Sequence, residues 1–260
     1  MHKFKIIGIT FFIVLIVLVL TYVLLPQDKS IKHYPLVENA FEAVPDFSSI
    51  SNVVEKKQAF FEYLAPAVEA QNSYILELRQ VVQGYKSLIV AGESLSSLQQ
   101  DNLNWLYEEY RINLEQSHEQ RFAELLRKID IIPLELVLVQ SANESAWGTS
   151  RFARDGYNFF GLWCFKKGCG FVPKRRNEGA THEVAKFDDL SSAMYSYMRN
   201  INRHDAYKEL RLIRHKRRNN QQNISAIALI DGLSKYSERG QEYIEELLQM
   251  IKVNKDLIPS

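Results

Sequence analysis

An acidic residue, Glu144, stands near the end of a mostly apolar stretch that covers residues 133–148. Pro133 suits the first turn of a helix, where its missing N–H is not needed, and Gly148 suits the position just past the last turn. The apolar residues between them fall on every side, which predicts a buried helix. A carboxylate there needs a partner such as Arg151, an opening to a cleft, or a raised pKa. A raised pKa would make Glu144 a general acid, whereas a partner would make it structural.

The residues around Glu144 resemble the catalytic signature of the glucosaminidase superfamily of bacterial cell-wall hydrolases, glycoside hydrolase family 73. In that family a helix ends in a Glu-Ser-x-Trp-Gly-x-Ser run, and an Asn-x-Phe-Gly loop follows. Here the run is residues 144–150 and the loop is residues 158–161. The resemblance implies a lysozyme-like architecture. It also implies that Glu144 protonates the leaving oxygen of a glycosidic bond.

A second carboxylate usually orients water or stabilises the transition state of such a reaction, and the family places one on a hairpin. Residues 182–187 alternate as a short strand, and residues 171–172 could pair with them across a turn. Glu183 is in phase with Phe187, so it points inward if Phe187 faces the core. Glu178 lies in the turn. Either glutamate could be the second carboxylate, with a slight preference for Glu183, or could form a surface salt bridge.

Aromatic and amide side chains cluster near Glu144 in the sequence. The rings of Trp147, Phe160 and Trp163 could stack on the apolar faces of sugars, with core filling as the alternative and the favoured role for Trp147. Asn158 either binds an N-acetyl group or shapes the following turn.

The resemblance further implies a functional tyrosine before the last helix. Tyr236 matches the first position of the family's segment, which here extends to Tyr243, but the small residues that usually follow it are absent. A packing role with a paired hydroxyl is the alternative for Tyr236.

Cys164 and Cys169 are the only two cysteines. Two thiols cannot make a closed zinc site, and no histidine lies at the usual spacing, so neither a metal nor a cofactor is expected. Outside the inner membrane the pair would form a disulfide that closes a small loop and adds roughly 2 kcal/mol. In the cytosol the two thiols would be free.

The elements that must position these residues are mostly helices. Apolar residues recur at steps of three and four over residues 51–92, which predicts an amphipathic helix that Pro66 kinks or divides. Further helices are expected at 98–111, 118–129, 191–200, 206–217, 224–232 and 241–251. The fold class is therefore mainly α with a small β-hairpin (α+β). It comprises a helical N-terminal part, 51–120, and a glucosaminidase-like catalytic domain, 121–260.

The first fifty residues predict an anchor and a tether. Residues 6–25 carry no charge, and at about 1.5 Å per residue they span the hydrocarbon core of a bilayer. The run is long for a signal peptide and lacks a small-x-small cleavage site, so residues 1–25 are expected to be a short tail and a retained transmembrane helix. Residues 26–50 contain three prolines and would form a tether.

Charge gives little further information, because the formal net charge is +1. The one basic run, residues 208–218, is either a solvated helix face or a contact for acidic stem peptides of peptidoglycan or for lipid head groups. The positive-inside rule decides the topology only weakly, but the short N-terminal tail and the resemblance favour an inner-membrane protein with its C-terminal domain in the periplasm. Nucleic acid is not an expected partner there.

Three functions are consistent with these observations. The first is a membrane-anchored hydrolase that cuts peptidoglycan glycan strands next to N-acetylglucosamine. The second is a lytic transglycosylase or muramidase with a single catalytic glutamate, in which groups of the substrate replace the second carboxylate. The third is a non-catalytic cell-wall-binding scaffold. Products ending in an anhydro sugar would indicate the second function, and reducing ends would indicate the first.

Overall fold

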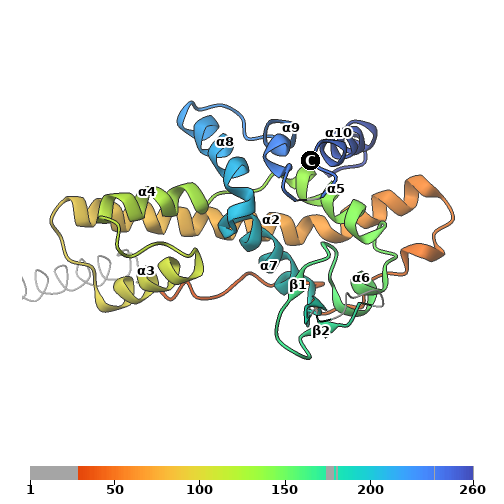
Figure 1. Cartoon of the computed structure of the whole chain (residues 1–260), viewed down its shortest axis with the longest axis horizontal. Coiled ribbons are helices and arrows are strands. Elements are labelled where there is room, and N and C mark those ends of the chain that lie inside the picture. Colours follow the sequence, from red (N-terminus) through yellow and green to blue (C-terminus); the bar gives the residue numbers. More distant parts are fainter. Residues whose placement is uncertain (1–28, 174–178, 180, 237, 260) are drawn as a thin grey trace, which may run out of the picture.

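The computed structural model describes residues 29–173, 179, 181–236 and 238–259, and one long helix, α2 (Val53–Val90), runs along the length of the molecule (Figure 1). The side chain of Asn52 caps its first turn by accepting hydrogen bonds from two backbone N–H groups. One face of α2 is buried from Phe60 to Tyr85. The amphipathic pattern of residues 51–92 therefore forms the single helix around which the rest of the chain packs.

The remaining elements follow in a simple order. They are η1 (Phe47–Ser49), α3 (Ser97–Glu109), α4 (His118–Lys128), α5 (Leu134–Ser145), α6 (Arg151–Gly156), β1 (Trp163–Cys164), β2 (Gly170–Phe171), β3 (Glu183–Ala185), α7 (Leu190–Arg203), η2 (Asp205–Tyr207), α8 (Lys208–Asn219), α9 (Ala226–Leu229), η3 (Ile230–Leu233) and α10 (Gln241–Asn254). The helices predicted after residue 50 are present with their ends shifted by a few residues, except that the one predicted at 224–232 is the short helix α9 followed by the 3-10 helix η3. The short helix α6 was not predicted.

The helices pack into one core. α2 contacts α4, α5 and α7, and α5 also contacts α10. Figure 1 shows α8, α9 and α10 above α2 and the β strands below it. A single cluster of buried apolar side chains extends from Phe60 on α2 to Ile251 on α10. The fold is therefore mainly helical with a small antiparallel sheet, and helices from both halves of the chain share its core.

Pro66 lies inside α2 and does not divide it into two helices. A proline within a helix removes one backbone hydrogen bond and costs about 3 kcal/mol. Here Pro66 is on the exposed face, so the unpaired carbonyl one turn earlier can bond to water, while Leu64, Ala67 and Val68 beside it are buried. Burial on the opposite face offsets the cost and keeps the helix continuous.

Residues 29–50 pack on the body of the protein, so the described part of this segment is not the free tether that its prolines predict. Ile31 is buried, and its carbonyl accepts a hydrogen bond from the hydroxyl of Tyr74 at 2.7 Å. Ala40 is buried, and its carbonyl accepts one from the N–H of Leu190. The ring of Phe47 is also fully buried. The prolines shape an extended path along α2 without releasing the chain.

The sheet has three strands in the order β1-β3-β2, with both neighbours antiparallel to the central strand. Phe171 pairs with Val184, as the predicted hairpin requires, and Trp163 pairs with Val184 from the other side. Strand β1 was not predicted, because two residues are too short for a visible alternation. Being central, β3 has all three residues buried, so Glu183 does point inward.

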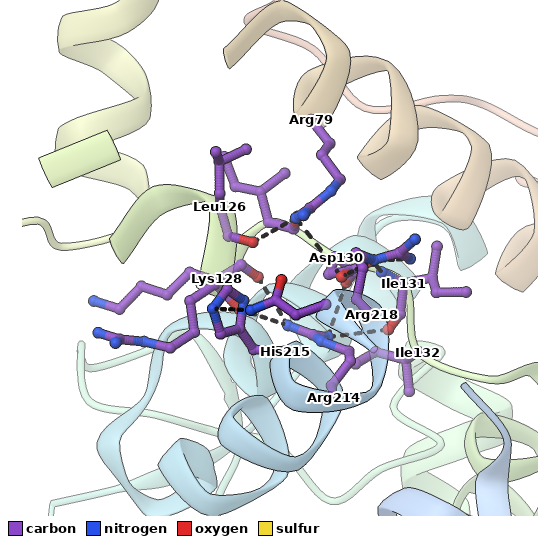
Figure 2. A network of polar contacts seen from close by, with 12 residues as sticks. Arg79, Leu126, Lys128, Asp130, Ile131, Ile132, Arg214, His215 and Arg218 are labelled. Atoms are coloured by element: carbon purple, nitrogen blue, oxygen red, sulfur yellow. Dashed lines mark hydrogen bonds and ion pairs between the residues drawn. The ribbon is translucent and has the colours of Figure 1, made fainter. Parts of the chain in front are cut away.

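The connection between α4 and α5 is held by buried arginines (Figure 2). Arg214 is fully buried, and it donates hydrogen bonds to four backbone carbonyls between residues 127 and 131 and to Asn202. Arg218 makes a paired contact with the carboxylate of Asp130, and Arg79 lies 3.6 Å from the same carboxylate. Part of the basic run 208–218 is thus an internal brace that holds this connection. The expectation of a solvated helix face is wrong for Arg214, which is fully buried.

Residues 6–25, the expected membrane span, lie outside the described residues. From residue 29 onward, no described helix combines the length and the apolar composition needed to cross a bilayer.

Candidate active site

Helix α5 ends in an unusual turn directly after Glu144. Ala146, Trp147 and Gly148 all have positive φ, at 51°, 58° and 75°, a conformation that is costly for the first two because they have side chains. Ser145 stabilises the turn: its buried hydroxyl accepts a hydrogen bond from the N–H of Gly148 at 2.8 Å and donates one to a carbonyl within α5. The Glu-Ser-x-Trp-Gly run therefore determines where α5 ends, and with it the position of Glu144.

Trp147 and Gly148 pack on α2 and not in the cleft described below. The Trp147 ring lies 5.7 Å and 5.3 Å from the rings of Phe60 and Phe61, and the Lys57 ammonium lies 5.0 Å from its centroid. A Cβ at Gly148 would come within 2.5 Å of Phe47, so only glycine fits there. Trp147 therefore takes the core role, and its predicted substrate-binding role has no support from its position.

A cleft of about 620 Å³ opens beside Glu144. One wall comes from the loop and sheet and carries Leu162, Trp163, Phe165 and Phe187; the other comes from α7 and the turn after it and carries Ser196, Arg199, Asn200, Arg203, His204 and Tyr207. Phe160 and Tyr236 also line it. Among the described lining residues, Glu144 is the one acid.

Glu144 is open to solvent through the cleft, yet protein atoms surround it on its other sides. The resulting loss of hydration raises the pKa of Glu144 above its usual value, and the negative charge of Glu246 adds to this. A hydrogen bond from the Tyr243 hydroxyl and the positive charge of Arg239 act in the opposite direction without cancelling it. The carboxyl is thus biased toward its protonated form, as a general acid requires.

A chain of hydrogen bonds behind Glu144 fixes its surroundings. The Tyr197 hydroxyl donates to Oε1 of Gln140 at 2.5 Å, and Nε2 of Gln140 donates to the Tyr243 hydroxyl at 3.1 Å. Tyr243 in turn donates to the Glu144 carboxylate. Gln140 is one helical turn before Glu144 on the same face of α5. Neither Tyr243 nor Gln140 was predicted as a site residue. The sequence signals that point to them are the Tyr236-to-Tyr243 run and the four-residue spacing from Gln140 to Glu144 on α5.

Tyr236 and Phe160 form an aromatic floor next to Glu144. Tyr236 stacks on Tyr243 with centroids 5.4 Å apart, and Phe160 stacks on Tyr197 at 3.7 Å. The Tyr236 hydroxyl donates to the carbonyl of Phe160 at 3.2 Å. Burial raises the pKa of Tyr236 well above its usual value. Tyr236 and Phe160 therefore lie in the predicted cleft, where Tyr236 is a neutral wall residue with an engaged hydroxyl.

Trp163 is the ring best placed to meet a ligand. It is 59% exposed on the cleft rim and stacks on His182, with centroids 4.1 Å apart and planes 14° from parallel. A flat indole held in one orientation and open on its other face suits the apolar side of a sugar ring.

Two other predicted site residues are occupied by structural contacts. Asn158 is buried; its side chain donates to the carbonyls of Leu162 and Ala185 and accepts from the N–H of Leu162. Asn158 therefore shapes the loop. Its amide nitrogen already donates to two carbonyls, so it has no donor left for an N-acetyl group. Glu183 is buried, and its two oxygens accept the N–H groups of Gly168 and Gly170 at 2.9 and 2.8 Å. Glu178 lies outside the described residues.

The loop that Glu183 holds is also closed by a disulfide between Cys164 and Cys169, whose Cα atoms are 6.2 Å apart. The sulfurs and the Glu183 carboxylate lie within 4.8 Å of one another, but bridged sulfurs are not thiolate ligands. This cluster is thus a clasp between β1, β3 and the intervening loop.

These features define a class of protein, and comparison with known sequences agrees. Residues 119–256 match the family described as glucosaminidase, mannosyl-glycoprotein endo-beta-N-acetylglucosaminidase, so the chain belongs to the glucosaminidase family and is in general terms a glycoside hydrolase. Within that family it is similar to Protein bax of Escherichia coli (strain K12), with 28% identity over 235 residues, which are 89% of this chain and 82% of that protein. No solved structure gives a significant match.

Proposed function

We propose that this protein is a peptidoglycan hydrolase that cleaves the glycan strand next to N-acetylglucosamine, with Glu144 as the general acid. The observation that carries the proposal is the position of Glu144: it is the one acid among the described lining residues of the cleft, and its pKa is raised. In the reaction, Glu144 gives its proton to the glycosidic oxygen as the bond to the sugar breaks, because an alkoxide is a poor leaving group. Water then forms the new bond to the sugar carbon and loses a proton.

The walls of the cleft would position the strand for this step. Trp163 offers a stacking surface on one wall, and the α7 wall offers hydrogen-bond donors from Asn200 and Arg203. The loop clasp at Glu183 holds the loop next to Trp163 on the sheet, and the pairing of β1 with β3 fixes the backbone of Trp163.

One observation favours the single-glutamate alternative, a lytic transglycosylase or muramidase. Both oxygens of Glu183 are engaged with loop amides, and no second acid lines the cleft among the residues described. Under that alternative a group of the substrate takes the role of the second carboxylate. The two chemistries share Glu144 and differ in their products.

The test uses the full chain with purified peptidoglycan and mass spectrometry of the released fragments. Glu144→Gln keeps the side-chain volume but has no proton to donate, so release should fall on the order of 10²- to 10⁴-fold. Glu135→Gln, on the first turn of the same helix, is the matched control and should keep the wild-type rate.

The products assign the chemistry. Reducing N-acetylglucosamine ends support the hydrolase, whereas anhydro ends support the transglycosylase. Wild-type turnover by Glu144→Gln would rule out Glu144 as the acid, and absence of release by the wild-type chain would leave the scaffold as the remaining function.

We further propose that residues 6–25 hold the protein in the inner membrane with the catalytic part in the periplasm. The support is their uncharged composition. A reporter that works only in the periplasm should be active when fused after Ser260. Activity of a cytosol-only reporter at that position would overturn this location.

A further inference from the structure

We infer that the α7 wall of the cleft binds a carboxylate of the acidic peptide attached to the glycan strand, through the guanidinium groups of Arg199 and Arg203. This inference rests on the proposed function, because it names the part of the substrate that the same cleft selects. Apart from its peptides, a peptide-bearing glycan strand presents neutral hydroxyls, acetamido groups and amide-linked lactyl groups. Two guanidiniums are better matched to carboxylates, with which they form paired, charge-assisted hydrogen bonds.

The two arginines face the cleft because of their spacing on α7. Arg199 and Asn200 lie three and four residues after Ser196, and Arg203 lies four and three residues after them, so the four share one face of α7, and all four line the cleft. The opposite face of α7, with Met194, Tyr197 and Ile201, is buried in the core. The helix therefore cannot turn these arginines away, and their side chains form a fixed polar wall within the cavity that contains Glu144.

The charge of this wall is only partly neutralised. The carboxylate of Glu109, on α3, lies 2.9 Å from Nη1 of Arg199 and 3.7 Å from Nη1 of Arg203. It also accepts a hydrogen bond from the Tyr195 hydroxyl at 2.5 Å. One carboxylate thus serves two guanidiniums, which leaves one positive charge in excess.

Arg203 is the less compensated of the pair. Partial burial lowers the pKa of Arg203 below its usual value, the nearby charge of Arg199 lowers it further, and Glu109 offsets this only in part. Its contacts with other described residues run through Nη1, to the carbonyl and the carboxylate of Glu109. Nε and Nη2 of Arg203 are therefore the donors left for a ligand that enters the cleft.

The experiment measures binding, so it does not depend on turnover. Full-length Glu144→Gln protein is titrated calorimetrically with two soluble glycan oligomers of equal length. One bears acidic peptides; the other is stripped of them by an amidase, and the lactyl carboxylates that this exposes are then capped as methyl amides. The peptide-bearing oligomer should bind about tenfold more tightly, the equivalent of one charge-assisted contact. Adding Arg203→Gln should reduce this preference to nearly one. Lys208→Gln, which removes an exposed positive charge outside the cleft lining, should leave it unchanged.

A second variant should change the binding affinity in the opposite direction, which a loss of folded protein cannot do. Glu109→Gln releases both guanidiniums from their shared partner, so it should strengthen binding of the peptide-bearing oligomer and not of the stripped one. Equal binding of the two oligomers by the parent, or an unchanged preference in Arg203→Gln, would overturn the inference and leave the hydrolase proposal standing. If neither oligomer binds, the hydrolase proposal fails and this inference with it.

Discussion

The hydroxyl of Tyr243 donates a hydrogen bond to the carboxylate of Glu144 and accepts one from Gln140, a residue 103 positions earlier in the chain. Helix α10 therefore reaches across to set the protonation of the end of α5. The bond favours the ionised form of Glu144, while burial favours the protonated form more strongly. The balance between the two decides over which pH range Glu144 still carries its proton.

Tyr243→Phe removes this bond while keeping the ring. The pKa of Glu144 should rise further, so the alkaline limb of the pH–rate profile should move to higher pH. Tyr74→Phe, which removes a hydroxyl bonded to the carbonyl of Ile31, is the control and should not move that limb. A shift to lower pH in Tyr243→Phe would show that the hydroxyl does not stabilise the carboxylate.

Glu144→Gln also makes a prediction about stability. Because the folded-state pKa of Glu144 is raised, the native state favours its protonated form, and stability from this group declines as pH rises through that pKa. Glutamine does not ionise. The variant should melt at or above the wild-type temperature at pH 7, with the gap closing below pH of about 4. A lower melting temperature at pH 7 alone would indicate a structural acid with good partners.

Glu183→Gln tests the role of the loop clasp. An amide can accept one of the two N–H groups but presents its own NH₂ to the other, so the variant should lose roughly 1–3 kcal/mol of stability. Turnover should fall only as far as folded protein is lost. If turnover instead drops as far as in Glu144→Gln at an unchanged melting temperature, Glu183 is the second carboxylate after all. Glu178→Gln, measured in parallel, covers the other candidate.

Substitutions of the two tryptophans near Glu144 should have different effects, one on glycan binding and the other on stability. Trp163→Ala removes an exposed ring and should weaken glycan binding by about tenfold, through the loss of about 1 kcal/mol or more of stacking, with little change in melting temperature. Trp147→Ala removes a ring packed on Phe60 and Phe61 and should cost about 3–5 kcal/mol of stability. Calorimetry and thermal melts distinguish them, and the reverse pattern would exchange their roles.

Asp130→Asn tests the arginine brace. Burial alone would raise the pKa of Asp130, but hydrogen bonds from Arg218 and the charges of Arg214 and Arg79 hold it below the usual value. The stability that Asp130 gains from these arginines is therefore fully present above pH of about 4, and it is lost as pH falls through the lowered pKa of Asp130. The variant should lose roughly 3–5 kcal/mol at pH 7 and lack this acid-dependent step. Asp101→Asn, at an exposed position of α3, is the control. An unchanged melting curve would refute the brace.

Local sequence signals predicted most of the helices and the position of Glu144 near the end of one of them. Pro133 marks the start of α5, because proline acts on the backbone at its own position. Gly148 does not mark the end: α5 stops at Ser145, and Gly148 is the last of three left-handed residues that follow it. The loop cysteines are close in sequence, so their pairing needs no knowledge of the fold. The packing of residues 29–50 could not be predicted, because it depends on α7 and α2 being present beside them.

The supporting residues of the cleft depend on long-range contacts. Arg214 looks like a surface charge in sequence, but its partners lie more than 80 positions earlier. Glu109 is one of many acids on exposed helices until α3 folds against α7. The left-handed turn at Ala146 and Trp147 was also missed, because neither residue favours positive φ; the turn is held by the Ser145 hydrogen bond to Gly148 and by packing around Phe47 and Phe60.

The length of α2 gives the molecule a built-in reach. The first described residues join the fold near Tyr85, where Asn102 bonds both to the Tyr85 hydroxyl and to the carbonyl of Lys29. The turn that follows Glu144 packs at the other end, where Trp147 contacts Phe60. At about 1.5 Å per residue, these two points on a single rigid helix are roughly 37 Å apart. Whatever holds the chain before Lys29, α2 fixes the distance between that point and the end of α5 that carries Glu144.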